Sequence, residues 1–256
     1  MAHLALHYMC SPEQLDLESI NDYLFYCQNM HKTPSESFFK HTIFGLRAIY
    51  RVLGMTAIRV MLPKIERQKD LPVVLSKQEV KALISAPKFL KHKLVVAMLY
   101  GCGLRNHELC DLEQTDIDFD RKTVFIKKKK GKTDRYVPLS DILANGLKKY
   151  FQTENPYKWV FNSQVTKEGE ILKYTQRGVQ WTIKEAKSKT GIQKRVTAHM
   201  LRHTYATHLL EDGLDIMSIK DLLGHAHIET TLVYLHVANL GRNPKFSPLD
   251  TLYKTE

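Results

Sequence analysis

Three polar segments interrupt otherwise apolar helical stretches, and the first carries an arginine that can bind an anion. In residues 101–109 (GCGLRNHEL), Arg105 follows a Gly-Leu turn at the start of a predicted helix. A guanidinium at such a position can face an anion near the helix N-terminus. Glu108 lies three residues later, on the same helical face, where it can brace a neighbouring group. A surface arginine that caps a turn would give the same pattern, so this segment alone does not decide a function.

The second segment, residues 197–204 (TAHMLRHT), combines a histidine and an arginine on one helical face. His199 and Arg202 are three residues apart, so both can reach one phosphoryl oxygen, the arginine as a planar fork and the histidine as a proton donor or acceptor. His199 and His203 also have the i, i+4 spacing of a metal-binding pair. No glutamate follows His199, and Arg202 would repel a cation, so a metal site is disfavoured.

The third segment joins Leu223-Gly224-His225 to the run TTLVYLH at residues 230–236. It supplies one more imidazole, from His225, and a phenol, from Tyr234. Most tyrosines in apolar helical segments are core or surface residues, so a structural Tyr234 is the default when the segment is considered alone.

The charge of the chain is concentrated outside its N-terminal part. The 256 residues carry a net charge of +11, and the isoelectric point is about 9.4. Residues 1–60 hold five basic and five acidic side chains, so the excess lies in residues 61–256 and is densest from Arg121 to Arg135. Such a stripe favours a polyanion such as nucleic acid, although a solvated charged hairpin explains the charge equally well.

Composition excludes several classes of protein. Hydrophobic residues make up 43% and charged residues 25%, as in globular proteins, so disorder and collagen-like structure are excluded. No apolar run is long enough to span a membrane, and the N-terminus lacks the pattern of a secretory signal. The four cysteines form no CxxC pair and are typical of reduced core residues. We therefore expect a cytoplasmic protein with no membrane association.

The periodicity of the chain predicts two domains. Apolar residues at helical spacing predict a small all-α domain over residues 1–62, with a helix boundary at 33–35. A polar, proline-bracketed stretch predicts a linker over 63–75. Residues 76–256 then form an α+β domain, mostly helical with a small antiparallel sheet. Its predicted strands are 116–120, 123–126 and 135–139, with a possible short strand at 159–161.

The helices expected in the second domain begin with one at Ser76, where S-K-Q-E forms a capping box. The others are expected over residues 91–100, 104–113, 140–152, 176–189, 198–211, 215–223 and 228–238. The basic stripe lies on the hairpin between the second and third strands, a shape that can follow a phosphate backbone or enter a groove.

Taken together, the motifs resemble those of the tyrosine recombinase (phage integrase) family, and most closely its Xer- and integron-like members. The matching segments are GLRNHEL at 103–109, KKGKTDRYVPL at 129–139, HMLRHTYATHLL at 199–210 and LLGHAHIETTLVYLHV at 222–237. They occur in the family's order and cover roughly residues 72–240. The helical region before the linker resembles the family's core-binding domain, but it is shorter than usual.

The resemblance implies an active site with all of its positions filled. The matching catalytic residues are Arg105, Lys130, His199, Arg202, His225 and Tyr234, with Glu108 in support. In this mechanism Tyr234 attacks a DNA phosphate and forms a covalent 3′-phosphotyrosine. The two arginines stabilise the charge of the transition state, His199 accepts the phenolic proton, and Lys130 protonates the departing 5′-oxygen. No metal or other cofactor is required.

The lysine hairpin leaves an alternative open. Lys129 or Lys132 can take the place of Lys130 if the hairpin register shifts. The other basic residues there, Lys128, Lys129, Lys132 and Arg135, are expected to bind DNA through its phosphates.

The implied partner is double-stranded DNA with specific recombination sites, synapsed in pairs by a homo-tetramer. A topoisomerase of the related type, which uses a similar set of residues on no defined site, is one alternative. A DNA-binding relative without catalysis is another, and a metal-dependent nuclease is disfavoured by its missing acidic ligands.

Overall fold

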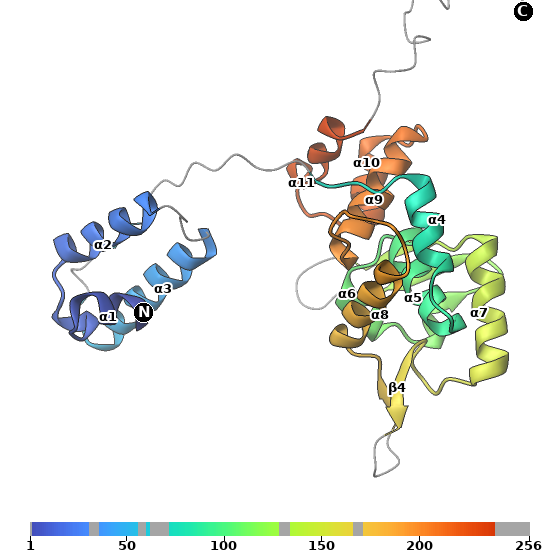
Figure 1. Ribbon diagram of the computed structural model, residues 1–256, viewed down its shortest axis with the longest axis horizontal. Helices are drawn as coiled ribbons and strands as arrows, with labels where there is room; N and C mark the ends of the chain where they lie inside the picture. The colour runs from blue at the N-terminus through green and yellow to red at the C-terminus, as the bar shows by residue number, and fades with distance from the viewer. Residues whose placement is uncertain are drawn as a thin grey trace, which may run out of the picture. The chain divides into compact units, whose positions relative to one another are not determined.

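The computed structural model describes residues 2–30, 36–55, 60–61, 72–127, 134–165 and 171–238 (Figure 1). The chain divides into two compact units, Met1–Lys69 and Asp70–Glu256. Within the described ranges, no helix combines the length and the apolar character that crossing a bilayer requires.

The first unit is helical, as its periodicity predicts. It contains α1 (Ala2–Tyr8), a 3₁₀ turn at Pro12–Gln14, α2 (Leu17–Asn29) and α3 (Glu36–Val52). Asp16 caps α2 by accepting a hydrogen bond from the backbone N–H of Ser19 at 2.8 Å. The helices enclose an apolar core of Leu4, Ile20, Tyr23, Leu24, Phe39, Ile43, Leu46 and Tyr50. The helix boundary predicted at 33–35 lies outside the described residues.

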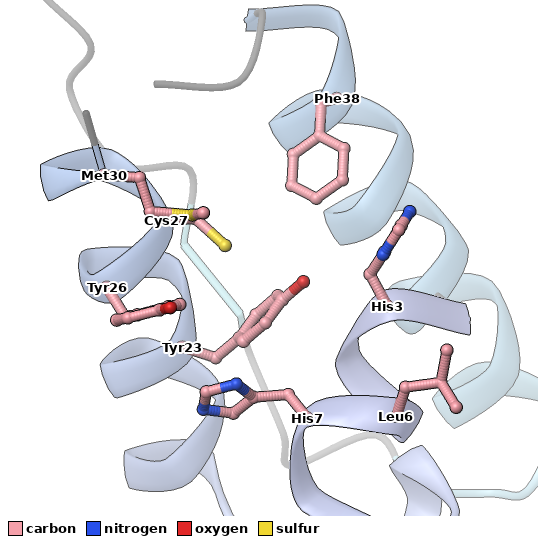
Figure 2. A pocket seen from close by; sticks show the side chains of 8 residues that line it. All are labelled: His3, Leu6, His7, Tyr23, Tyr26, Cys27, Met30 and Phe38. Carbon is pink, nitrogen blue, oxygen red and sulfur yellow. The ribbon is translucent and has the colours of Figure 1, made fainter. Parts of the chain in front are cut away.

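A pocket of about 440 Å³ opens between the three helices of this unit. Figure 2 shows its lining side chains, which come from α1, α2 and the start of α3: His3, Leu6, His7, Tyr23, Tyr26, Cys27, Met30 and Phe38. The lining is largely apolar and aromatic, and it contains none of the predicted catalytic residues.

Residues 63–71 of the predicted linker lie outside the described ranges. Its end is described, and there Leu75 is fully buried in the core of the second unit. The backbone N–H of Leu75 donates to the hydroxyl of Thr204 at 3.2 Å. Residue 75 therefore packs as part of the second unit.

The sheet of the second unit carries the strands that the sequence predicts. β1 (Ile117–Asp118), β2 (Thr123–Ile126) and β3 (Arg135–Pro138) are antiparallel in the order β1-β2-β3. Ile126 lies opposite Arg135, which sets the register of the hairpin. The side chains of β3 alternate, so Arg135 and Val137 face inward and Tyr136 faces solvent. The hairpin tip, residues 128–133, lies outside the described residues.

Helices make up most of the second unit: α4 (Lys77–Ser85), α5 (Leu90–Gly101), α6 (Asn106–Asp111), α7 (Asp141–Glu154), α8 (Gln176–Ser188), α9 (Ala198–Glu211) and α10 (Ile216–Leu223) (Figure 1). The capping box predicted at Ser76 is present, because Ser76 and Glu79 exchange side-chain and backbone hydrogen bonds. The apolar helix α5 packs against α4, α7, α8 and α9, so it lies at the centre of the core. This packing holds in place the turn after α5, which leads to Arg105.

Two predicted elements differ from the observed ones. The strand expected at 159–161 is replaced by β4 (Asn162–Val165), which pairs with β5 (Ile171–Lys173), while Trp159 makes only an isolated bridge to Glu113. The helix expected at 228–238 is broken into α11 (Glu229–Leu232) and a 3₁₀ turn, η3 (Val233–His236). The tighter turn changes the direction of successive side chains, and it includes Tyr234.

Candidate active site

The turn between α5 and α6 directs Arg105 and requires glycine at position 103. Gly103 has φ of +59°, a conformation that L side chains rarely adopt. A Cβ at this position would also lie 2.4 Å from Cδ1 of Tyr205. This close approach brings the turn against α9, so Arg105 and the α9 residues lie near each other.

Glu108 holds two arginines in place. Its Oε1 accepts hydrogen bonds from Nη1 of Arg105 and Nη1 of Arg135, each at 2.9 Å, and its Oε2 accepts from Nη2 of Arg135 and from the backbone N–H of Arg105, each at 2.8 Å. Burial by itself would raise the pKa of Glu108, but the Arg135 fork and the Arg105 hydrogen bonds lower it to about 2. The carboxylate is therefore ionised at neutral pH, and the brace expected from the sequence is present.

The carboxyl end of α10 binds the same arginines. Gly224 ends the helix in the left-handed conformation, with φ of +60°, and leaves the last carbonyls without helical partners. Leu222 O accepts from Nε of Arg135 at 2.7 Å, and Leu223 O accepts from both Arg105 and Arg202. The negative end of the helix dipole thus stabilises a cluster of cations that would otherwise repel one another.

Arg202 is the most enclosed of these cations. It is 2% exposed, and its Nη1 donates to Gly103 O at 2.7 Å. Glu108 Oε2 lies 3.9 Å from the same nitrogen. Burial and the nearby Arg105 lower the pKa of Arg202 to about 9, which still leaves the side chain cationic at pH 7. Its orientation is thereby fixed before any ligand binds.

His225 follows directly after the glycine that ends α10. Its Nδ1 lies 2.9 Å from the hydroxyl of Thr231, which is fully buried. Burial, together with Arg202, Arg105, His203 and Arg135, lowers the pKa of His225 to about 3. The imidazole is therefore neutral at pH 7, and in the tautomer in which Thr231 donates to Nδ1 its proton lies on Nε2.

Tyr234 is buried, and its hydroxyl is hydrogen-bonded to a histidine. It is 1% exposed, and Oη lies 2.9 Å from Nδ1 of His203. Burial raises the pKa of the phenol, while Arg202 and Arg105 act in the opposite direction. The sequence predicts that His199 is the histidine beside the phenol. In the structure His203 holds this position, and His199 is exposed and stacks edge-to-face on His203 with ring centroids 4.1 Å apart.

The structure brings together six of the predicted site residues. Arg105, Glu108, His199, Arg202, His225 and Tyr234 lie in one group that α6, α9, α10 and η3 supply. Lys128, Lys129, Lys130 and Lys132 lie outside the described residues. Arg135 is 7% exposed and its guanidinium is bound to Glu108 and Leu222, so in this structure it positions Glu108, and its expected contact with DNA stays a prediction.

Two polar partners in this group were absent from the predicted set. The spacing of His203 from His199 suggested only a disfavoured metal pair, and nothing in the sequence linked it to Tyr234, 31 residues away. Thr231 looked like one of several threonines before the tyrosine. The sequence offered only the helical spacing of His203 and Thr231 from the predicted residues. Spacing alone does not show which group on another element a side chain contacts.

Pockets of about 330 and 280 Å³ flank α6 on the side of Trp159 and α8, with His107, Asp111 and Lys173 shared between them. Neither holds an arginine or histidine of the predicted catalytic set. Within the described ranges, no group of three or more histidine, cysteine or acidic side chains is arranged to hold a metal ion.

Comparisons with known proteins agree with the geometry. The model of the phage integrase family matches residues 73–240. "Tyrosine recombinase XerA" of Thermococcus kodakarensis is 39% identical over 200 residues, which cover 75% of this chain and 68% of the relative. "Tyrosine recombinase" of Thermosipho africanus is 35% identical over 218 residues, which cover 81% and 74%. The crystal structure of XerA recombinase superposes with a TM-score of 0.60 at 27% identity, covering 93% of this chain and 85% of that one.

Proposed function

Because the chain belongs to the phage integrase family of tyrosine recombinases, we propose that it cuts and rejoins double-stranded DNA at specific sites through a covalent bond between Tyr234 and a 3′-phosphate. The bond energy of the cleaved phosphodiester is retained in the phosphotyrosine, so a strand can be rejoined by the reverse reaction without ATP.

One observation carries this proposal: Arg105 and Arg202 donate to the same carbonyl, Leu223 O, beside the buried Tyr234 hydroxyl. Two fixed guanidinium groups next to a phenol suit a phosphoryl transfer in which a tyrosine is the nucleophile. A buried tyrosine with a purely structural role would have no need of two cations that burial makes costly.

The roles of the residues follow from their chemistry. As Oη of Tyr234 attacks phosphorus, the P–Oη bond forms and the P–O5′ bond breaks. The two arginines and Nε2–H of His225 donate to the non-bridging oxygens, where negative charge accumulates. Lys130 supplies the proton that the departing 5′-oxygen takes up. His199, exposed beside Arg202, is proposed to contact the same phosphate.

The proposed partner is a pair of DNA sites held by a homo-tetramer. The net charge of +11, concentrated in residues 61–256, supports binding to the phosphate backbone, with Lys128, Lys129 and Lys132 as sequence-independent contacts. The curated relatives carry the name recombinase, an activity that requires two sites to be exchanged.

The test is covalent trapping on duplexes that carry candidate sites with a nick or a 5′-bridging phosphorothiolate. Wild-type protein should form an adduct that survives denaturation and EDTA and is joined through the 3′-phosphate. Tyr234→Phe should bind the same DNA and form none. An adduct with Tyr234→Phe would overturn the assignment of the nucleophile, and relaxation of supercoiled plasmids without any site preference would favour a topoisomerase.

A further inference from the structure

The hydroxyl of Tyr234 and the imidazole of His203 form a hydrogen-bonded pair within the site. Oη lies 2.9 Å from Nδ1, and the ring centroids are 5.5 Å apart. Tyr234 is 1% exposed and His203 is half-buried, so few water molecules can compete for the phenolic proton. Nδ1 of His203 therefore has the direct contact that a proton acceptor needs.

The groups that face His203 decide its charge. They are His199 and Arg202 on its own helix α9, His225 after α10, and Tyr234 in η3, with Arg105 acting on the same groups from the start of α6. Burial, His199 and Arg202 lower the pKa of His203 to about 4, so its imidazole is neutral at pH 7. A neutral imidazole has a free lone pair, which a base requires.

We propose that Nδ1 of His203 accepts the proton of the Tyr234 hydroxyl as Oη attacks the scissile phosphate. This inference rests on the proposed function, in which Tyr234 is the nucleophile. The Oη–H bond breaks, the Nδ1–H bond forms, and the electron pair left on Oη forms the bond to phosphorus. The 5′-oxygen leaves with a different proton, the one assigned to Lys130.

The arrangement also explains how the same imidazole becomes a stronger base only when DNA is present. In the free protein burial, His199 and Arg202 disfavour the imidazolium. A bound phosphodiester adds a negative charge beside Arg202 and offsets part of its repulsion, which raises the pKa of His203. Proton transfer is thereby linked to occupancy of the site, and the phenolate is not formed without a phosphate to attack.

The decisive variant is His203→Asn, because Oδ1 of asparagine takes a position close to that of Nδ1. Asparagine keeps a hydrogen-bond acceptor for the phenol but cannot take up its proton at neutral pH. A purely structural role predicts normal cleavage by this variant. The proposal predicts that adduct formation falls by about 100-fold or more, with DNA affinity and thermal stability unchanged. His92→Asn, at a half-buried histidine that contacts Trp181 edge-to-face, serves as the matched control.

A second substrate distinguishes the loss of the proposed base, His203, from the loss of the proposed acid, Lys130. A 5′-bridging phosphorothiolate leaves as a thiolate and needs no proton, so it should restore cleavage by Lys130→Ala but not by His203→Asn. In addition, the acidic limb of the wild-type pH–rate profile should be absent from His203→Asn. Normal cleavage by His203→Asn, or its rescue by the phosphorothiolate, would overturn the proposal while leaving Tyr234 as the nucleophile. An adduct with Tyr234→Phe would overturn both.

Discussion

The site has two halves that differ in how their groups are charged. The charged half consists of Arg105, Arg135 and Arg202 together with Glu108. The carboxylate of Glu108 and the carbonyls that end α10 accept hydrogen bonds from the three guanidinium groups. The imidazole half consists of two neutral groups: His199, His203 and Tyr234, joined by one hydrogen bond and ring contacts, and His225 with Thr231, joined by a hydrogen bond.

Burial and the charged half together set the charge of the imidazole half. Burial is the main cause that lowers the pKa of His199, His203 and His225; Arg202 adds to it for all three and Arg105 for two of them. The imidazoles are thus kept neutral, which is the state in which they can accept or relay protons near pH 7. Electrostatic stabilisation and proton transfer are assigned to different residues, and each can be altered separately.

Removing the charge of Glu108 should destabilise the charged half more than any other change considered for the two halves. Glu108→Gln leaves Arg105 and Arg135 without their anion in a buried environment, so we expect a loss of about 3–5 kcal/mol in the free energy of unfolding. Chemical denaturation measures it. The control is Glu113→Gln, which removes a partly exposed ion-pair partner of Lys127 and should change stability by less than about 1 kcal/mol. Equal losses in the two variants would contradict the buried role of Glu108.

Replacing the fork of Arg202 with a point charge should affect the reaction next most strongly. Arg202→Lys keeps a cation but cannot donate to both Gly103 O and Leu223 O, so its charge will not be held towards the phosphate. We expect adduct formation to slow by about 100-fold. Single-turnover kinetics measure this, with Arg121→Lys in an exposed turn as the control, and a rate near that of the wild type would show that charge alone suffices.

Acid should act on the imidazole half before the charged half. The pKa of His225 is lowered from 6.5 to about 3 in the folded state, so its neutral form contributes stability above pH 6.5 that is lost as the pH falls towards 3. Glu108, with a pKa lowered from 4.5 to about 2, contributes stability that is lost only below pH 4.5. Between pH 7 and 4.5 the free energy of unfolding should fall in both proteins. After allowance for solvent screening, we expect the fall in His225→Asn to be about 1 kcal/mol smaller than in the wild type. Denaturant titrations at the two pH values measure the difference, and parallel losses would contradict the assignment.

The smallest expected effect comes from the hydroxyl that orients His225. Thr231→Val has nearly the same shape but cannot hydrogen-bond to Nδ1, so we expect a stability loss of about 1 kcal/mol. Adduct formation should slow by up to about 10-fold, because the tautomer of His225 is no longer selected. Thr230→Val, at an exposed neighbouring position, should change neither quantity.

The two halves also differ in how far the sequence predicted them. The family resemblance is confirmed by the match of residues 73–240, and the helices that carry Arg105, Glu108, His199 and Arg202 were predicted with small shifts at their ends. The brace between Arg105 and Glu108 was predicted because the two residues are neighbours on one helical turn. Arg135 was expected to bind DNA because it belongs to the basic stripe of the hairpin, whereas the alternation of β3 turns its side chain inward.

Motif order and local spacing are enough to predict the family, the order of helices and strands in the second unit, and the residue types available to a phosphate. Which imidazole contacts Tyr234 depends instead on tertiary packing. Helical spacing cannot specify a contact between α9 and η3, which depends on the 3₁₀ turn at Tyr234 and on the packing of that turn against α9. Tertiary packing also brings Arg105, Arg135 and Arg202 to the carbonyls at the end of α10, because a glycine can mark where a helix ends but not which side chains reach its last carbonyls.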